Sequence, residues 1–290
     1  MVWRGIPREA TAKPALIEPI EDAPPEGNWP LLHTVTLAHS SAAAIRGRRP
    51  ASRILGCMSE EGEIPSLPLM EDAVAHPDEV KPTWRGWIHA GTFPITIVAG
   101  VILLFSADGA AARWSSAVFV VTSMLLFGNS ALYHRLNWQP RTRVILKRID
   151  HANIFLLIAG SYTPISVLAL PPEKSVPLLL LVWGGAIVGI AFRVFWIHAP
   201  RWLYVPLYLV LGWGALVFIV DFFQANALMM TLIAVGGLFY SVGAAVYGFK
   251  RPNPVPGVFG FHEIFHSLTV LAFLCHWVAI MLIATHPLYP

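Results

Sequence analysis

The twenty residues from Pro177 to Trp196, P-L-L-L-L-V-W-G-G-A-I-V-G-I-A-F-R-V-F-W, carry a single charged side chain, Arg193. An α-helix needs about 20 predominantly apolar residues to cross about 30 Å of hydrocarbon. Within lipid the backbone must satisfy its own hydrogen bonds, so a single spanning segment of this kind is helical. The stretch therefore predicts a transmembrane helix.

The whole composition agrees with that prediction. The 290 residues are 56% hydrophobic and 13% charged, with a mean hydropathy of +0.60, which lies well outside the range of soluble domains. Similar apolar stretches recur along the chain, and with the first they predict seven spans: 88–106, 115–134, 150–170, 177–196, 202–220, 228–248 and 263–284. The sequence thus predicts an all-α, multi-pass protein of the cell membrane with seven transmembrane helices.

Basic residues predict the orientation, because cytoplasmic loops of membrane proteins collect Lys and Arg. The second, fourth and sixth predicted loops, counted with the span ends beside them, hold nine: Arg135, Arg141, Arg143, Lys147, Arg148, Arg193, Arg201, Lys250 and Arg251. The first, third and fifth loops hold only Arg113 and Lys174. We therefore expect a cytoplasmic N terminus and a C terminus on the outside.

The region before the first span has a different character. Residues 1–83 hold most of the acids and many prolines without a sustained helical or strand period, which predicts a largely disordered cytoplasmic tail. Residues 84–290 form the predicted membrane domain. No signal peptide is recognised, so the first membrane helix is expected to direct insertion. The net charge of +3, without a basic groove, excludes nucleic acid as a partner, and two cysteines are too few for a disulfide framework.

Three histidines fall in one predicted layer of the membrane. His134 closes the second span on the cytoplasmic side, and His262 and His266 open the seventh span on the same side. Two histidines at i and i+4 lie on one helix face, so both rings can reach one cation. With a third histidine from another helix, they would supply the three ligands of a catalytic zinc site.

Two oxygen-bearing residues accompany these histidines. Asp150 is predicted to open the third span in the same layer, where it could deprotonate the attacking water or orient a ligand. Ser130 lies one turn deeper than His134 and could donate to a developing oxyanion. Simpler interpretations stay open, because a histidine at a helix end is often only an interfacial polar group. Asp150 could likewise serve only as a negative charge at a helix N-terminus.

His262 to His266 also spell H-E-x-x-H, the pattern of zinc peptidases. Those enzymes take a third ligand from downstream, but His276 lies ten residues further on, about 15 Å along the helix. A third ligand must therefore come from upstream, which argues against an intramembrane metalloprotease. Glu263 could act as a base beside the metal or point toward the basic loops. For His276 we expect a hydrogen bond between helices, with a substrate contact as the alternative.

At this point the chain resembles a known family, the hemolysin III branch of the progestin and adipoQ receptor (PAQR) family, which is related to alkaline ceramidases. The resemblance spans roughly residues 84–284. It is carried by three motifs in order, N-S-A-L-Y-H-R-L (129–136), R-I-D-H-A-N-I-F-L-L-I-A-G-S-Y-T-P (148–164) and H-E-I-F-H-S-L-T-V-L-A-F-L-C-H-W (262–277).

The resemblance implies one zinc site near the cytoplasmic face. His134, His262 and His266 would be the ligands, Asp150 would hold the water at the metal, and Ser130 would support a ligand or stabilise the oxyanion. Bacterial members usually carry a T-H-x-x-G pattern, of which this chain keeps the histidine in I-H-A-G, residues 88–91. That histidine could support the site, although an interfacial histidine is the simpler interpretation.

The resemblance further implies a reaction. Because the family is related to ceramidases, we expect a zinc-dependent hydrolase of a lipid amide, with an N-acyl membrane lipid as its substrate. Two alternatives stay open: a membrane-lytic protein, and a receptor or sensor, each with zinc in a structural role. Neither the substrate nor the oligomeric state follows from the sequence.

Overall fold

The computed structural model describes residues 82–196 and 198–289. The predicted tail, residues 1–83, lies outside this part of the chain except for Pro82 and Thr83. The described residues form α2 (Trp87–Ser106), α3 (Gly109–Arg135), α4 (Pro140–Ala169), α5 (Pro172–Phe195), α6 (Arg201–Gly212), η1 (Gly214–Phe218), α7 (Ile219–Ala225), α8 (Ala227–Phe249) and α9 (Phe261–Thr285). They make seven helical spans long and apolar enough to cross a membrane, with α6, η1 and α7 together forming the fifth. The prediction of an all-α seven-helix protein is confirmed.

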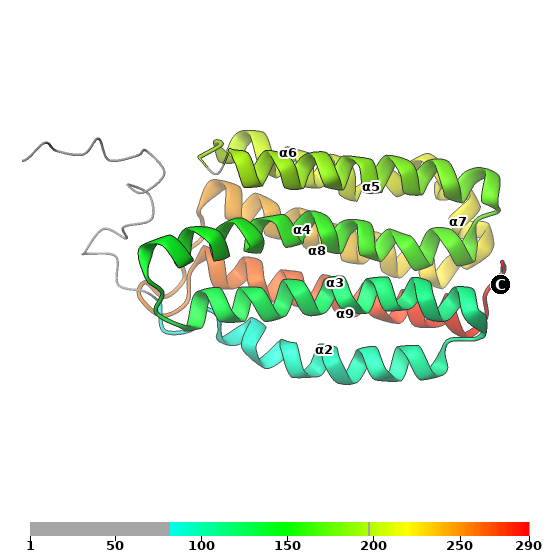
Figure 1. Cartoon of the computed structure of the whole chain (residues 1–290), viewed down its shortest axis with the longest axis horizontal. Coiled ribbons are helices and arrows are strands. Elements are labelled where there is room, and N and C mark those ends of the chain that lie inside the picture. The colour runs from blue at the N-terminus through cyan, green and yellow to red at the C-terminus, as the bar shows by residue number, and fades with distance from the viewer. Residues whose placement is uncertain (1–81, 197, 290) are drawn as a thin grey trace, which may run out of the picture. The chain divides into compact units, whose positions relative to one another are not determined.

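The helices run side by side along one axis, as Figure 1 shows. The most buried span is α4, while α9 contacts α2, α3, α4 and α8. A tight crossing joins α3 to α4, because Gly160 lies against Thr122 and a Cβ at this glycine would collide with that side chain. Small residues that allow such close approach are typical of helix contacts in membranes.

The third span begins ten residues earlier than predicted. Pro140 is its first residue, where the fixed φ and the missing amide hydrogen of proline suit a helix start. Most of the basic residues assigned to the second loop therefore lie in the first turns of α4. The prediction that Asp150 opens this helix is wrong, since Asp150 lies about 15 Å along α4 from its first residue.

The fifth span is interrupted near its middle, which the sequence did not predict. Between α6 and α7 the chain turns into the short 3-10 helix η1, so some backbone groups lose their α-helical partners. Tyr162 of α4 compensates for this loss. Its hydroxyl donates to the Gly212 carbonyl at 2.7 Å and accepts from the Ala215 amide at 2.7 Å.

Antiparallel packing brings the end of α3 and the starts of α2, α4, α6 and α9 to one end of the bundle, which we call the histidine end (Figure 1). The segment before α2 is tied to the α8–α9 loop there, because the Thr83 amide donates to the Gly257 carbonyl at 3.1 Å. Arg193, counted with the fourth loop for the charge rule, lies within the helix, as the predicted span 177–196 implies. It is buried in the last turn of α5, with its guanidinium 4.1 Å from the Tyr204 ring centroid.

Candidate metal centre

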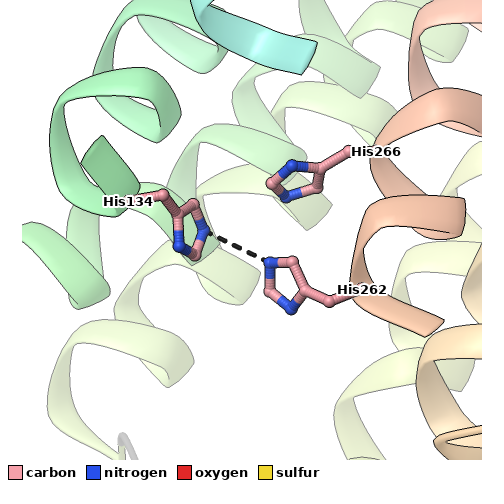
Figure 2. Close-up of side chains that lie close together, drawn as sticks. All are labelled: His134, His262 and His266. Atoms are coloured by element: carbon pink, nitrogen blue, oxygen red, sulfur yellow. Dashed lines mark hydrogen bonds between the residues drawn. The ribbon is translucent and has the colours of Figure 1, made fainter. Parts of the chain in front are cut away.

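The three predicted histidines converge at the histidine end. His134 lies in the last turn of α3, and His262 and His266 lie one turn apart at the start of α9. One ring nitrogen from each lies within 4.8 Å of the others. Figure 2 shows the three rings pointing toward one another from the two helices. The α3–α9 contact therefore brings together side chains that are 128 residues apart in the sequence.

The types of donor atom, and the spacing of one pair of them, suit a metal ion. The Nε2 atoms of His134 and His262 are 3.3 Å apart. Two nitrogens that bind one tetrahedral zinc at about 2.0 to 2.1 Å are themselves about 3.3 Å apart. Imidazole nitrogen is a preferred ligand of zinc, and three protein ligands with one open position describe its catalytic sites. These histidines could therefore hold a metal ion.

Asp150 faces the same cluster from α4. Its Oδ2 lies 3.7 Å from His134 Nε2, beyond a direct hydrogen bond. The carboxylate keeps 17% of its exposure, so it lies at the edge of the cluster and not within it. Ser130 is buried one turn along α3 from His134 and lines the same cavity as Asp150. The earlier start of α4 thus leaves Asp150 in the predicted layer.

His89 lies deeper in the site than the interfacial position preferred from the sequence. Only 2% of it is exposed, and its ring stacks on that of His266 with centroids 3.8 Å apart and planes 11° apart. His89 therefore packs against the face of one ring of the cluster and forms one of its walls. Gly86, just before α2, lets the chain approach His134 closely, because its φ is +80° and a Cβ there would lie 2.6 Å from His134 Cβ.

Glu263, the acid of the H-E-x-x-H pattern, is engaged elsewhere. One of its carboxylate oxygens pairs with Arg85 Nε at 2.5 Å, and the other accepts the Gly260 amide hydrogen at 2.9 Å. Only 1% of its side chain is exposed. Glu263 therefore joins the start of α9 to the segment before α2. One expectation from the sequence was that Glu263 points toward the basic loops. Its partner, Arg85, instead lies before the first span.

A cavity of about 960 Å³ opens beside the histidines. Along α8 it is lined from Tyr247 down to Met230, about 25 Å of helix. Its deeper wall includes Leu157 and Ile158 of α4, which suit an apolar chain. His276 lines the deeper part and makes the expected contact between helices, with Nε2 3.3 Å from the Ile233 carbonyl of α8. The cavity is within the size range of small-molecule sites.

Comparisons with known proteins agree with this architecture. Residues 78–277 match the family described as Haemolysin-III related. A Hemolysin-3 homolog of Bacillus subtilis (strain 168) is 32% identical over 180 residues, which cover 61% of this chain and 81% of the relative. Hemolysin-3 of Bacillus cereus is 31% identical over 161 residues, 54% of this chain and 73% of that protein. The heptahelical transmembrane protein ADIPOR2 of Oryza sativa subsp. japonica is 29% identical over 185 residues, 58% and 81% of the two chains.

Proposed function

This chain belongs to the Haemolysin-III related family of multi-pass membrane proteins, and on that premise we propose that it is a zinc-dependent hydrolase of a membrane-lipid amide. The observation that carries the proposal is the meeting of three histidine nitrogens within 4.8 Å, beside a carboxylate and a large cavity. By the predicted orientation, the site would face the cytoplasm.

The residues of the site divide into a binding group and a proton-transfer group. His134, His262 and His266 would hold the ion. When bound, zinc would polarise the amide carbonyl and lower the pKa of a water molecule toward about 7. Asp150, at the edge of the cluster, would accept the proton of the attacking water and return it to the leaving amine. The hydroxyl of Ser130 would donate to the oxyanion that develops on the carbonyl.

The cavity supports a lipid as the substrate. The part of the cavity at the histidine end contains the histidines and Asp150. The part further along the bundle axis runs between α4, α6, α8 and α9. An amide whose polar head reaches the histidine layer would leave its acyl chain among apolar side chains such as Leu157, Ile158 and Met230. Burial of that chain would supply binding free energy and place the carbonyl at the cluster.

The contacts of Glu263 count against the peptidase alternative. Both of its oxygens are occupied, by Arg85 and by the Gly260 amide, so it is not placed to act as a base. A membrane-lytic role is the second candidate, and it is favoured by the names of two relatives, Hemolysin-3 and a Hemolysin-3 homolog. In that case zinc would clamp α3 to α9 without turnover.

Replacement of His134 tests the proposal. We expect the purified wild-type protein to hold stoichiometric zinc, measured by elemental analysis, and to hydrolyse an N-acyl lipid in detergent. His134→Ala should lose both properties, because two histidines from one helix bind zinc weakly. His286→Ala is the matched control, since that histidine is exposed near the C-terminal end of the chain and should leave both unchanged.

Two outcomes would count against the hydrolase. Stoichiometric zinc without turnover of any N-acyl lipid across several detergents would leave the ion a structural role. If His134→Ala lost zinc but the protein still lysed membranes, the lytic alternative would be favoured, because lysis does not require the chemistry of the ion.

A further inference from the structure

Five basic residues line the cavity at the histidine end, and we call them the cationic mouth. They come from four separate segments of the chain: Arg85 before α2, Arg143 and Lys147 in the first turns of α4, Arg201 at the start of α6, and Lys250 after α8. Among the described residues, only two carboxylates line the same cavity, those of Asp150 and Glu263. The mouth therefore carries an excess of positive charge.

The two carboxylates do not balance the charge of all five basic residues. Glu263 is paired with Arg85, and Asp150 is directed toward His134. Arg201 is held in place by a hydrogen bond to the Tyr247 carbonyl at 3.3 Å and by the Tyr247 ring, whose centroid lies 4.7 Å from the guanidinium. These contacts fix the position of Arg201 without neutralising it, because neither partner carries a negative charge.

The tendency of cytoplasmic loops to be basic does not by itself account for this arrangement. That tendency requires positive residues near the membrane but not their convergence on one cavity. Arg141 and Arg251 satisfy it at the same end, and both are exposed and do not line the cavity. Arg135 satisfies it while lying 3.9 Å over the Trp87 ring. Convergence on the cavity is thus a separate property of the five.

Low-dielectric walls strengthen the attraction between such a cluster and an anion. Arginine and lysine also form charge-assisted hydrogen bonds with phosphate and carboxylate oxygens. We propose that the cationic mouth binds the anionic headgroup, a phosphate or a carboxylate, of the acylated amphiphile that the cavity takes up. The inference rests on the proposed function for the acyl chain and its scissile amide. It adds that the substrate is an acidic N-acyl lipid and not a neutral one.

A pair of probes with the same acyl chain tests this proposal. Binding of N-hexanoyl sphingosine and of its 1-phosphate to the full-length protein in detergent is measured by microscale thermophoresis. We expect the phosphate-bearing probe to bind roughly tenfold more tightly or better, with the preference falling as salt is raised. The double variant Arg143→Gln with Lys250→Gln should lose the preference, because it removes two cations of the mouth.

Matched variants separate the mouth from general charge and from folding. Arg141→Gln with Arg251→Gln changes the net charge equally at the same end and should keep the preference. Arg143→Lys with Lys250→Arg preserves the charge and should keep most of it. Equal affinity of the wild type for the two probes would overturn the proposal, and so would an equal loss of preference in the Arg141 and Arg251 variant.

Two further arms identify the source of the anion and the dependence on metal. Inorganic phosphate should compete only weakly with the phosphate-bearing probe, and competition as strong as that of the lipid itself would mean a site for free anion, against the proposal. His266→Ala, which should lose the metal, should still prefer the phosphate-bearing probe. If the wild-type protein showed the preference but did not hydrolyse the N-acyl lipid, the proposed hydrolase would be contradicted and the headgroup site would not. Loss of the preference in His266→Ala, together with the metal, would overturn the headgroup site.

Discussion

The two ends of the bundle use charge differently. At the histidine end, five basic side chains and a cluster of histidines line an internal cavity. At the opposite end, Lys174 and Asp221 pair at 2.6 Å with 42% and 29% of their side chains exposed. Backbone contacts close that end, as where the Asp108 amide donates to the Ala284 carbonyl at 2.8 Å. Charge is arranged around a cavity at one end and lies on exposed side chains at the other.

The buried pair at the histidine end should give the largest effect on stability. Glu263→Gln removes the negative charge beside Arg85 and should lower the free energy of unfolding by about 3 kcal/mol, as expected when one partner of a buried pair is lost. The value is at the lower end of that range because 22% of the Arg85 side chain stays exposed. Chemical unfolding in detergent micelles measures the change.

Glu173→Gln is the control for that substitution. Glu173 is exposed in the first turn of α5, and its loss should change the free energy of unfolding by no more than about 0.5 kcal/mol. If Glu263→Gln instead unfolded like the wild type and lost all turnover, Glu263 would be a base and the difference between the ends would need another explanation.

A smaller effect is expected midway between the ends, at the break in the fifth span. Tyr162→Phe removes the hydroxyl that serves the Gly212 carbonyl and the Ala215 amide. The free energy of unfolding should fall by about 1 to 2 kcal/mol, because the Gly212 carbonyl and the amide of the buried Ala215 lose their partner. Tyr289→Phe, at an exposed tyrosine near the C terminus, should have no measurable effect. Equal unfolding curves for the two variants would show that the break does not need Tyr162.

The smallest effect belongs to the opposite end. Lys174→Gln should lower the free energy of unfolding by no more than about 0.5 kcal/mol, because both partners of its ion pair reach solvent. A double-mutant cycle with Asp221→Asn isolates the coupling between the two charges. A coupling energy several times larger would mean that this exposed pair stabilises the fold as much as the buried pair does. That result would contradict the difference between the two ends.

Some of the candidate site could be predicted from the sequence. The alternation of span ends assigns His134, His262 and His266 to one layer, and the i, i+4 spacing places two of them on one helix face. The position of His89 could not be predicted in this way. An interfacial histidine and one stacked on His266 have the same place in the sequence, and only the packing of α2 against α9 separates them.

The partner of Glu263 could not be predicted from the sequence either. The H-E-x-x-H spacing says which residues share a helix face, but it does not say which partner an acid meets. Its ion-pair partner, Arg85, is 178 residues away in the sequence. The helix break at η1 was also missed, because its lost backbone bonds are replaced by a side chain from another span. The orientation of the termini stays a prediction from the basic loops.

Hydropathy read along the chain was enough for the number of helices, their order and the residues that share a layer. The reason is local, since a peptide group left unpaired in hydrocarbon costs several kcal/mol, and outside the break at η1 a helical span pairs its backbone groups within itself. Which spans become neighbours was decided by tertiary packing alone. In lipid that choice depends on shape, as where Gly160 admits Thr122, and on hydrogen bonds between helices. The contact of α3 with α9 was therefore decided in three dimensions, and with it the closing of the histidine cluster.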